Sequence, residues 1–299
     1  MIPAPVTGGR SYGSPGAFRR ALTDKLRNLA AASRWTLQQL QRQMAYDRLL
    51  ERLYLVDEGW IIKGATALLA RDIGVRGTID IDLYREVARE IAEADLRHAA
   101  ALDIGDWFRF EIGPPRTLAD TSGARLPVKA LVGNAEWAAF HVDLVGEDLR
   151  MTGDPEDVPP LAPVVMPDVQ QHGYRAYPLA DHVADKACAI FERHGPTGTP
   201  STRYRDLVDL VAIVLSAPVE AEPHLIALRS EAQRRGLQLP GRFAVPDQPL
   251  WQRGYAAEAG RSLGLTIRVA GFPDALVDKA DGSTDRSPFQ PGRAEPGDL

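Results

Sequence analysis

Two aspartates on one short predicted strand are the feature that most constrains this chain. They lie in the run Ile79-Asp80-Ile81-Asp82-Leu83, and side chains alternate between the two faces of a β-strand. Asp80 and Asp82 are therefore expected to point the same way, with the three apolar residues pointing into the core. Two carboxylates on one face of a buried strand repel each other and lose hydration. A divalent cation resolves that conflict, and the alternative is a solvated strand edge with two exposed aspartates.

A tight turn of small residues precedes this strand. Residues 60–62 are predicted to form a short buried strand, Gly64-Ala65-Thr66 the turn that leaves it, and residues 67–71 the start of a helix. Small residues let the backbone approach a ligand closely, and Mg²⁺ binds one or two carboxylates together with substrate phosphates. Together, the turn and the strand favour a site for a metal-bound nucleoside triphosphate.

The composition predicts a soluble, cytoplasmic protein of more than one domain. The chain has 299 residues, of which 44% are hydrophobic and 25% charged, and this is ordinary for a globular protein. The sequence shows no apolar run long enough for a membrane span and no secretion signal. Cys188 is the only cysteine, so we expect a packed side chain. The net charge of −5 argues against nucleic-acid binding through overall charge but permits a local basic face.

The chain divides into four predicted parts. Residues 1–56 are expected to form N-terminal helices, residues 57–150 an α/β core, residues 168–278 a helical domain that completes the site, and residues 279–299 a disordered tail. Prolines between residues 155 and 167 mark the boundary or a long loop. Strands are expected at residues 60–62, 79–83, 107–112, 126–132 and 138–145, which suffices for one mixed sheet.

Capping signals place the first two helices. Ser14-Pro15 provides an N-cap and a first-turn proline for a helix over residues 16–33. Thr36 with Gln39 forms a capping-box pattern that begins a second helix, ending near residue 56. Later helices are expected at residues 178–193, 201–216, 219–235 and 251–263.

Two further charged residues, Asp143 and Lys186, extend the candidate site. Asp143 lies on the face of its strand opposite Phe140, Val142 and Leu144, so it is a third carboxylate able to share metal ions, or an exposed residue near a strand end. Lys186 falls in an apolar helical stripe, where it must either find an anion or extend outward to solvent. That anion is a triphosphate, or in the alternative Asp181 or Asp185.

The segment after Arg203 is predicted to be a helix that is apolar nearly all round. Asp206 and Asp209 are therefore expected in packed surroundings, where an unpaired charge is expensive. Arg205 and Asp209 are able to pair at i,i+4, and Lys186 is able to meet Asp206 between helices. A structural ion-pair network and a catalytic role for Asp206 both remain open. Basic residues that could flank an RNA path are Arg19, Arg20, Lys25, Arg27, Arg203, Arg205, Arg229, Arg234 and Arg235.

Four ordered motifs resemble one family. They are Lys63-Gly64-Ala65-Thr66, Thr78-Ile79-Asp80-Ile81-Asp82-Leu83, Tyr177-Pro178-Leu179-Ala180-Asp181 with Ala184-Asp185-Lys186, and Arg203-Tyr204-Arg205-Asp206-Leu207-Val208-Asp209-Leu210. In this order they resemble the AbiEii-type nucleotidyltransferase toxins, including the mycobacterial MenT group, within the DNA polymerase β-like superfamily. The resemblance extends over roughly residues 55–215, with a looser fit at Trp251, Tyr255 and Phe272-Pro273.

The resemblance implies a fold and a set of site residues. The fold class is α/β (α+β), a nucleotidyltransferase mixed sheet flanked by helices, with a C-terminal helical domain. The expected residues are Asp80, Asp82, Lys186 and Asp206 for catalysis; Lys63, Gly64, Thr66, Thr78 and Lys186 for the nucleotide; and Asp80, Asp82 and Asp143 for Mg²⁺. One departure is Ala65, where the family usually has a second glycine.

The resemblance also implies an activity. The expectation is Mg²⁺-dependent transfer of a nucleoside monophosphate from a triphosphate, CTP being one candidate, to an acceptor hydroxyl. The expected acceptor is the 3′ end of tRNA, because several family members modify it and thereby block translation. A cognate antitoxin is the expected protein partner. The alternatives are a catalytically silent protein that binds nucleotide or RNA, and transfer to a protein or small molecule.

Overall fold

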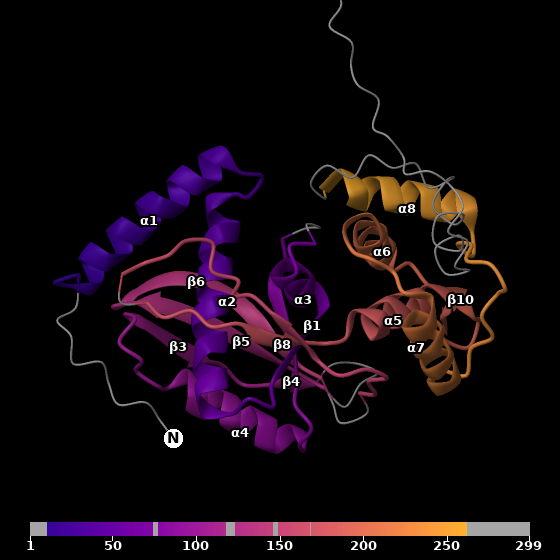
Figure 1. Ribbon diagram of the computed structural model, residues 1–299, viewed down its shortest axis with the longest axis horizontal. Coiled ribbons are helices and arrows are strands. Elements are labelled where there is room, and N and C mark those ends of the chain that lie inside the picture. The colour runs from indigo at the N-terminus through magenta and orange to yellow at the C-terminus, as the bar shows by residue number, and fades with distance from the viewer. Residues whose placement is uncertain (1–10, 74–76, 118–122, 146–148, 168, 262–299) are drawn as a thin grey trace, which may run out of the picture.

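The computed structural model describes residues 11–73, 77–117, 123–145, 149–167 and 169–261, and the chain runs from a sheet-containing part into a group of helices (Figure 1). The predicted tail over residues 279–299 and the looser family match at Phe272-Pro273 lie outside the described residues. The division into domains at residues 56, 150 and 168 stays a prediction.

The first two helices begin where their caps predict. Helix α1 spans Pro15–Ala32, and the side chain of Ser14 accepts a hydrogen bond from the backbone N–H of Ala17. Helix α2 spans Leu37–Val56 and begins with the reciprocal capping box of Thr36 and Gln39. Each cap satisfies backbone N–H groups that have no partner within the helix. The sequence predictions for both helices are confirmed.

Within the described residues, an eight-stranded mixed sheet has the order β3-β5-β6-β2-β1-β8-β7, with β4 pairing to β5. The strands are β1 Ile61–Lys63, β2 Asp80–Tyr84, β3 Phe108–Ile112, β4 Arg116–Thr117, β5 Ala124–Val132, β6 Ala135–Leu144, β7 Glu156–Val158 and β8 Tyr174–Ala176. Strand β2 is parallel to β6 and antiparallel to β1. With the short helix α3 (Gly64–Ala70) after β1 and helix α4 (Arg89–Ala100) after β2, this confirms the predicted mixed α/β fold.

The hairpin of β5 and β6 contains a bulge. Next to the turn, Leu131 pairs with Glu136, but from Ala130 and Ala138 onward the register is shifted by one residue. Trp137 is the extra residue on β6, and its indole N–H donates to the carbonyl of Gln41 on α2 at 2.9 Å. The shift determines which side chains of the two strands face each other further along the hairpin.

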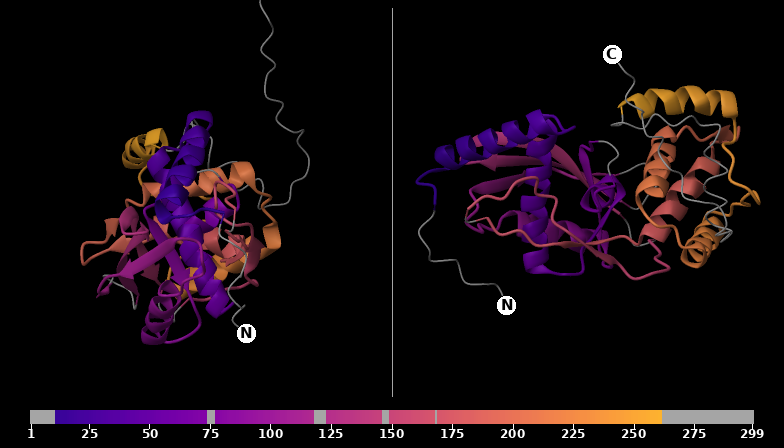
Figure 2. Two further views of the ribbon diagram at one scale, coloured as in Figure 1. Left: turned by 90° about the vertical axis from the view of Figure 1, so that its left-hand side faces the viewer. Right: turned by 45° about the horizontal axis from the view of Figure 1, so that its top comes forward.

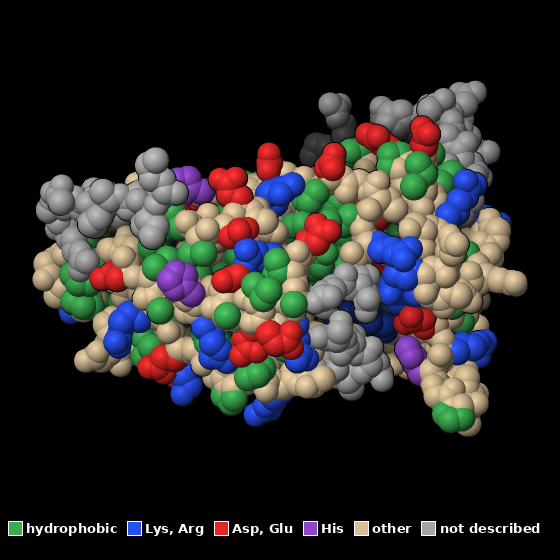
Figure 3. All heavy atoms as spheres, turned by 90° about the horizontal axis from the view of Figure 1, so that it is seen from below, with side chains coloured by type: hydrophobic (Ala, Val, Ile, Leu, Met, Phe, Trp, Pro, Cys, Tyr) green, Lys and Arg blue, Asp and Glu red, His purple; other side chains and the backbone are tan. Residues whose placement is uncertain are grey.

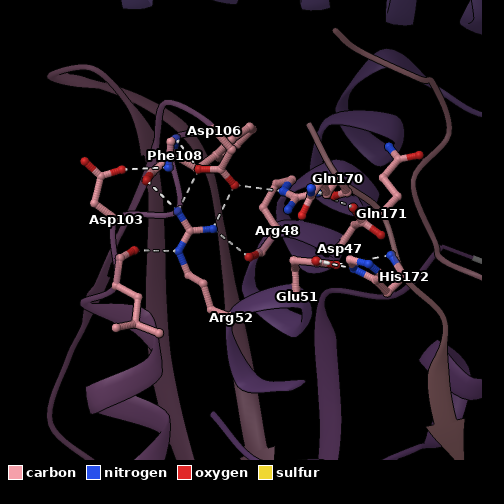
Figure 4. Close-up of polar contacts among 12 residues, drawn as sticks. Asp47, Arg48, Glu51, Arg52, Asp103, Asp106, Phe108, Gln170, Gln171 and His172 are labelled. Atoms are coloured by element: carbon pink, nitrogen blue, oxygen red, sulfur yellow. Dashed lines mark hydrogen bonds and ion pairs between the residues drawn. The ribbon is translucent and has the colours of Figure 1, made fainter. Parts of the chain in front are cut away.

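Helix α2 is held on the sheet partly by a buried ion network (Figure 4). Arg52 donates to both oxygens of Asp106 at 2.7 and 2.8 Å, and the Nε of Arg48 donates to the same carboxylate at 2.8 Å. Both arginine side chains are buried, and they hold the pKa of Asp106 below its usual range although burial alone would raise it. Asp106 also accepts the backbone N–H of Phe108 at 3.0 Å, so the network fixes the start of β3.

A second apolar core lies among the later helices, which stand beside the sheet at the end away from α1 (Figures 1 and 2). These helices are α5 Leu179–Phe191, α6 Tyr204–Ser216, α7 Ala221–Arg234 and α8 Gln248–Arg261. Strands β9 (Arg193–His194) and β10 (Thr199–Pro200) form a separate two-stranded sheet between α5 and α6. Helix α8 begins three residues earlier than predicted. No helix within the described ranges is both long and apolar enough to cross a membrane.

Two details differ from the sequence predictions. Strand β7 lies in the proline-rich region taken as a boundary or loop, whereas β8 lies after it, within the segment predicted to be the helical domain. Strand β8 pairs with β7 and, in parallel, with β1 through Ile62 and Ala176. Such short strands carry little periodic signal. Ile79 is 51% exposed, so the expectation that it points into the core is wrong. Strand β2 begins only at Asp80, while Ile81 and Leu83 are fully buried as expected.

Candidate active site

The predicted site residues gather around one cavity between the sheet and the helices α5 and α6. This cavity of about 360 Å³ is lined by Lys63, Gly64, Thr78, Asp80, Asp82, Asp143, Lys186 and Asp206. Thr66 does not line it. Strand pairing explains the convergence, because Asp82 is level with Lys63 on β1 and with Asp143 on β6.

The three aspartates form a cluster of like charges on adjacent strands. Burial, followed by the charges of Asp143 and Asp80, raises the pKa of Asp82 to about 6. The Oδ1 atom of Asp80 is buried without a hydrogen bond, and its neighbour is Nδ1 of His141 at 3.3 Å. Both oxygens of Asp143 accept from Arg125, at 2.8 Å from Nε and 2.6 Å from Nη2. The cluster therefore lacks much of the positive charge that would balance it.

Gly64 holds its backbone directly against one of these carboxylates. Its φ of +58° lies in the left-handed region, and a Cβ at this position would be 1.7 Å from Oδ2 of Asp82. Only glycine fits this conformation and this contact without rearrangement. The predicted turn of small residues is the first turn of α3 in the structure, because the helix begins at Gly64 and not at residue 67. This first turn brings the Gly64 backbone and the Asp82 carboxylate together.

The two predicted threonines support strand β2 from its beginning. The hydroxyl of Thr78 donates to the carbonyl of Asp80 at 3.0 Å and accepts the Asp80 backbone N–H at 3.2 Å. Thr66 is fully buried in α3, and its hydroxyl donates to the same carbonyl at 3.2 Å. In this structure both hydroxyls position Asp80.

Lys63 connects the sheet to the helical part. Its Nζ donates to Oδ2 of Asp185 on α5 at 2.7 Å and lies 4.2 Å from the centre of the Tyr177 ring. The other oxygen of Asp185 accepts from Arg235 at 2.6 Å. Although burial acts in the opposite direction, these cations hold the pKa of Asp185 well below its usual range.

Lys186 lies between two carboxylates of α6. Its Nζ donates to Asp206 at 2.9 Å and to Asp209 at 2.7 Å, and all three side chains are buried. Burial would lower the pKa of Lys186, but these two charges raise it above its usual range. The contact expected between Lys186 and Asp206 is confirmed. Asp181 and Asp185 are not its partners, because Asp181 accepts from Thr152 and Asp185 from Lys63.

The structure gives Arg205 a different partner from Asp209, with which the sequence allowed it to pair. Arg205 instead pairs with Glu258 on α8 at 3.2 Å, and Arg203 pairs with Asp206. The side chains of Arg203 and Arg205 are 57% and 61% exposed at the cavity. Arg235, by contrast, is engaged by Asp185, Glu192 and Glu231, so its charge is balanced within the protein.

The carboxylates of the aspartate cluster are chemically suited to Mg²⁺ if the substrate supplies the remaining ligands of the ion. Among the residues that the structure describes, no three acidic, histidine or cysteine side chains are arranged to hold a metal ion by themselves. Mg²⁺, however, commonly binds one or two carboxylates and takes its other ligands from water and phosphates. Asp80 has a buried oxygen that accepts no hydrogen bond, and Asp82 is short of positive charge, so this pair fits such a site. Asp143 is engaged by Arg125.

Sequence reasoning missed Arg125 and His182, both of which line the cavity. Arg125 faces Asp143 only because of the bulge at Trp137, since an unshifted hairpin would place Arg125 opposite Val142. His182 is 2% exposed. Burial, with the charges of Lys186 and Lys63, holds its pKa well below the usual range, so the imidazole is neutral. His182 lies four residues before Lys186 on α5, so the two side chains fall on the same face of the helix. This spacing was the available signal for His182.

Comparisons with known proteins agree with the predicted fold. A family model described as the nucleotidyl transferase AbiEii toxin of a type IV toxin–antitoxin system matches residues 48–278. Among solved structures, the chain is similar to MenT4, a nucleotidyltransferase toxin from Mycobacterium tuberculosis H37Rv. The two are 16% identical, the match covers 88% of this chain and 91% of that chain, and the TM-score is 0.58.

A weaker similarity involves JHP933 from Helicobacter pylori. It is 14% identical, the match covers 80% of this chain and 89% of that chain, and the TM-score of 0.41 is too low to add to the argument. No curated protein sequence matches the chain.

Proposed function

Because this chain belongs to the AbiEii nucleotidyltransferase toxin family, we propose that its cavity transfers a nucleoside monophosphate from a triphosphate to an acceptor hydroxyl, with pyrophosphate leaving. The observation that carries the proposal is the set of aligned aspartates on β2 and β6 beside the backbone of Gly64. Such a cluster suits a metal-bound triphosphate, since cation and phosphates together balance the charge and fill the coordination.

The residues of the cavity take separate roles in this proposal. Asp80 and Asp82 hold Mg²⁺, with Asp143 as a third ligand when it is released from Arg125. When bound, Mg²⁺ lowers the pKa of the attacking hydroxyl and neutralises charge on the transferring phosphoryl group. Gly64 leaves room for the phosphates beside Asp82, and Thr78 and Thr66 hold Asp80 in place. Lys63 and Lys186 provide positive charge in the cavity wall. Positioning and charge stabilisation supply most of the catalysis.

Neutralising one predicted metal ligand tests the reaction class. Asp80→Asn keeps the shape of the side chain but removes its charge, so nucleotide transfer should be abolished while the melting temperature changes little. Asp154→Asn, at an exposed aspartate outside the cavity, is the matched control and should keep full activity. The assay incubates each protein with total RNA, Mg²⁺ and each labelled triphosphate in turn. Undiminished transfer by Asp80→Asn would refute the metal assignment, and nucleotide binding without transfer by the wild type would favour the silent alternative.

The acceptor in this proposal is the 3′ end of tRNA, recognised mainly through its phosphates. The exposed guanidinium groups of Arg203 and Arg205 at the cavity support contact with a phosphate backbone. The face shown in Figure 3 carries interspersed acidic and basic side chains over the sheet-containing part. It is therefore not a uniformly basic surface that would offer RNA an alternative binding site. Sequencing RNA 3′ ends after expression in cells identifies the acceptor and the added nucleotide. Toxicity that depends on Asp80 with unchanged tRNA ends would favour a protein or small-molecule acceptor.

The salt dependence of RNA binding tests the contribution of the exposed arginines at the cavity. Arg205→Gln should weaken RNA binding at every sequence and reduce the slope of log affinity against log salt by about 1. Arg109→Gln is the control, because Arg109 is also exposed but lies on β3, does not line the cavity and is not among the basic residues predicted to flank RNA. Identical slopes in both variants would exclude Arg205 as a phosphate contact. The type IV system named for the family also supports a cognate antitoxin as a partner in the cell.

A further inference from the structure

Arg125 lies directly against the proposed metal ligands. Its planar guanidinium binds Asp143 in a two-point contact at 2.8 and 2.6 Å, and Nη2 lies 3.8 Å from Oδ2 of Asp80. The side chain of Arg125 is 38% exposed, whereas that of Asp143 is only 10% exposed. One cation from the protein itself therefore balances part of the aspartate cluster, from the solvent side.

The contact is specific in its geometry. The β5–β6 register places Arg125 opposite Asp143, and a fork of two N–H donors matches the two oxygens of a carboxylate. The lysines of the cavity do not substitute for it. Lys63 is bound to Asp185, and Lys186 lies between Asp206 and Asp209. Among these cations, Arg125 is the one whose hydrogen bonds go to the aspartates of β2 and β6.

We propose that Arg125 is a resident counter-cation that competes with the metal ion for Asp143. The inference rests on the proposed function, since it assumes a metal site at Asp80 and Asp82. While the guanidinium holds both oxygens of Asp143, that carboxylate is closed to a metal, and the positive charge beside Asp80 opposes a second cation. Metal entry requires Arg125 to swing toward solvent, and its long, partly exposed side chain permits this movement. The apparent metal affinity is then reduced by the fraction of molecules in the closed state.

Binding of Mn²⁺ to the nucleotide-free protein tests this competition, measured by calorimetry and by the electron paramagnetic resonance signal of free Mn²⁺. Arg125→Gln should tighten Mn²⁺ binding by roughly tenfold or more, because it removes the competing cation. Arg125→Lys should give an intermediate affinity, because an ammonium keeps the positive charge but cannot donate two parallel hydrogen bonds to the carboxylate of Asp143. Arg205→Gln is the matched charge control, since Arg205 lines the same cavity but pairs with Glu258. It should change the affinity by less than about twofold.

A reciprocal measurement needs no variant at position 125. If metal and Arg125 exclude each other, Mg²⁺ must loosen Arg125 by the same coupling. Nuclear magnetic resonance of the wild type should therefore show faster solvent exchange of the Arg125 Nε–H on adding Mg²⁺, and no such change in the Asp80→Asn variant.

The outcomes separate this inference from the proposed function. Equal or weaker Mn²⁺ binding by Arg125→Gln, together with wild-type binding that Asp80→Asn abolishes, overturns the competition and leaves the metal site standing. No Mn²⁺ binding by any variant overturns the competition and also contradicts a metal site in the free protein. Tighter binding by Arg125→Gln that the additional change Asp80→Asn removes supports both.

Discussion

Gly64 and Gly195 have similar backbone conformations in different surroundings. Their φ angles are +58° and +70°, but a Cβ on Gly64 would lie 1.7 Å from Asp82, while nothing lies within 4 Å of a Cβ on Gly195. Gly64→Ala should therefore destabilise the protein by roughly 2–4 kcal/mol and remove nucleotide transfer. Gly195→Ala should cost only about 1–2 kcal/mol from left-handed strain. Urea unfolding and transfer assays measure both, and retained activity in Gly64→Ala would show that the close contact is dispensable.

Lys186 has a structural and a proposed chemical role that one substitution cannot separate. Lys186→Met leaves the buried carboxylates of Asp206 and Asp209 without their shared cation, so it should destabilise the protein by about 3–5 kcal/mol. In Lys186→Met/Asp209→Asn one of these charges is also removed, and Arg203 still pairs with Asp206. The double variant should regain much of the stability but no transfer activity. Recovery of activity together with stability would assign Lys186 a purely structural role.

The roles of single residues were predictable where a pattern of neighbouring residues in the sequence indicates them. Gly64, Asp80 and Asp82 stand out because a small-residue turn and an alternating strand are local patterns. Arg125 was not predictable, because its importance depends on a partner 18 residues away and on one bulge between them. The partners of Lys186 were only partly predictable, since two carboxylates on α6 were available and helix packing selects both.

At the scale of elements, α2 carries a buried aspartate, Asp47, whose ionisation destabilises the folded state. Burial, partly offset by Arg48 and the Tyr174 hydroxyl, raises the pKa of Asp47 from 3.8 to about 6. Between these pH values the folded state binds more protons than the unfolded state, so stability falls as the pH rises through this window. At about pH 8, Asp47→Asn should thus have a free energy of unfolding roughly 3 kcal/mol higher than that of wild type, measured by urea unfolding, and it should lose this advantage toward about pH 4.

The control for this prediction is Asp24→Asn, at an exposed aspartate on α1. It should leave the pH dependence of unfolding unchanged. An Asp47→Asn variant that is less stable than wild type at every pH would show that the hydrogen bond from Tyr174 to the ionised carboxylate outweighs its burial.

Long elements were predicted well and short ones poorly. The caps of α1 and α2 and the apolar stripes of the later helices placed these helices within a few residues. Strands β7 and β8 have only three residues each, too few for an alternating pattern, and they pair with a sheet formed by distant segments. Their existence is a property of the assembled sheet more than of their own sequence.

At the scale of the whole molecule, Cys188 reports on the integrity of the helical part. It is the chain's only cysteine and is fully buried in α5, where burial raises its pKa to about 12. A thiol reagent such as dithionitrobenzoate should react with the native protein far more slowly than with the urea-unfolded chain. Bound Mg²⁺ and nucleoside triphosphate should slow the reaction further, by about a hundredfold at ligand concentrations a hundred times Kd.

Protection by ligand should be lost in Asp80→Asn, although Asp80 lies on β2 and Cys188 on α5. That outcome would indicate that nucleotide bound at the sheet stabilises the helical part across the cavity. Rapid reaction of the native wild type, equal to that of the unfolded chain, would contradict the burial of Cys188.

The bulge at Trp137 has a genetic consequence. Loss of that single codon would let the hairpin close without its extra residue while keeping Ala130 opposite Ala138 and Arg125 opposite Asp143. Gain of one codon between Ala138 and Asp143 would instead bring Arg125 opposite Val142, and every side chain of β6 beyond the insertion would change faces. The number of codons between the turn and the aspartate of β6 therefore carries information that residue identities alone do not.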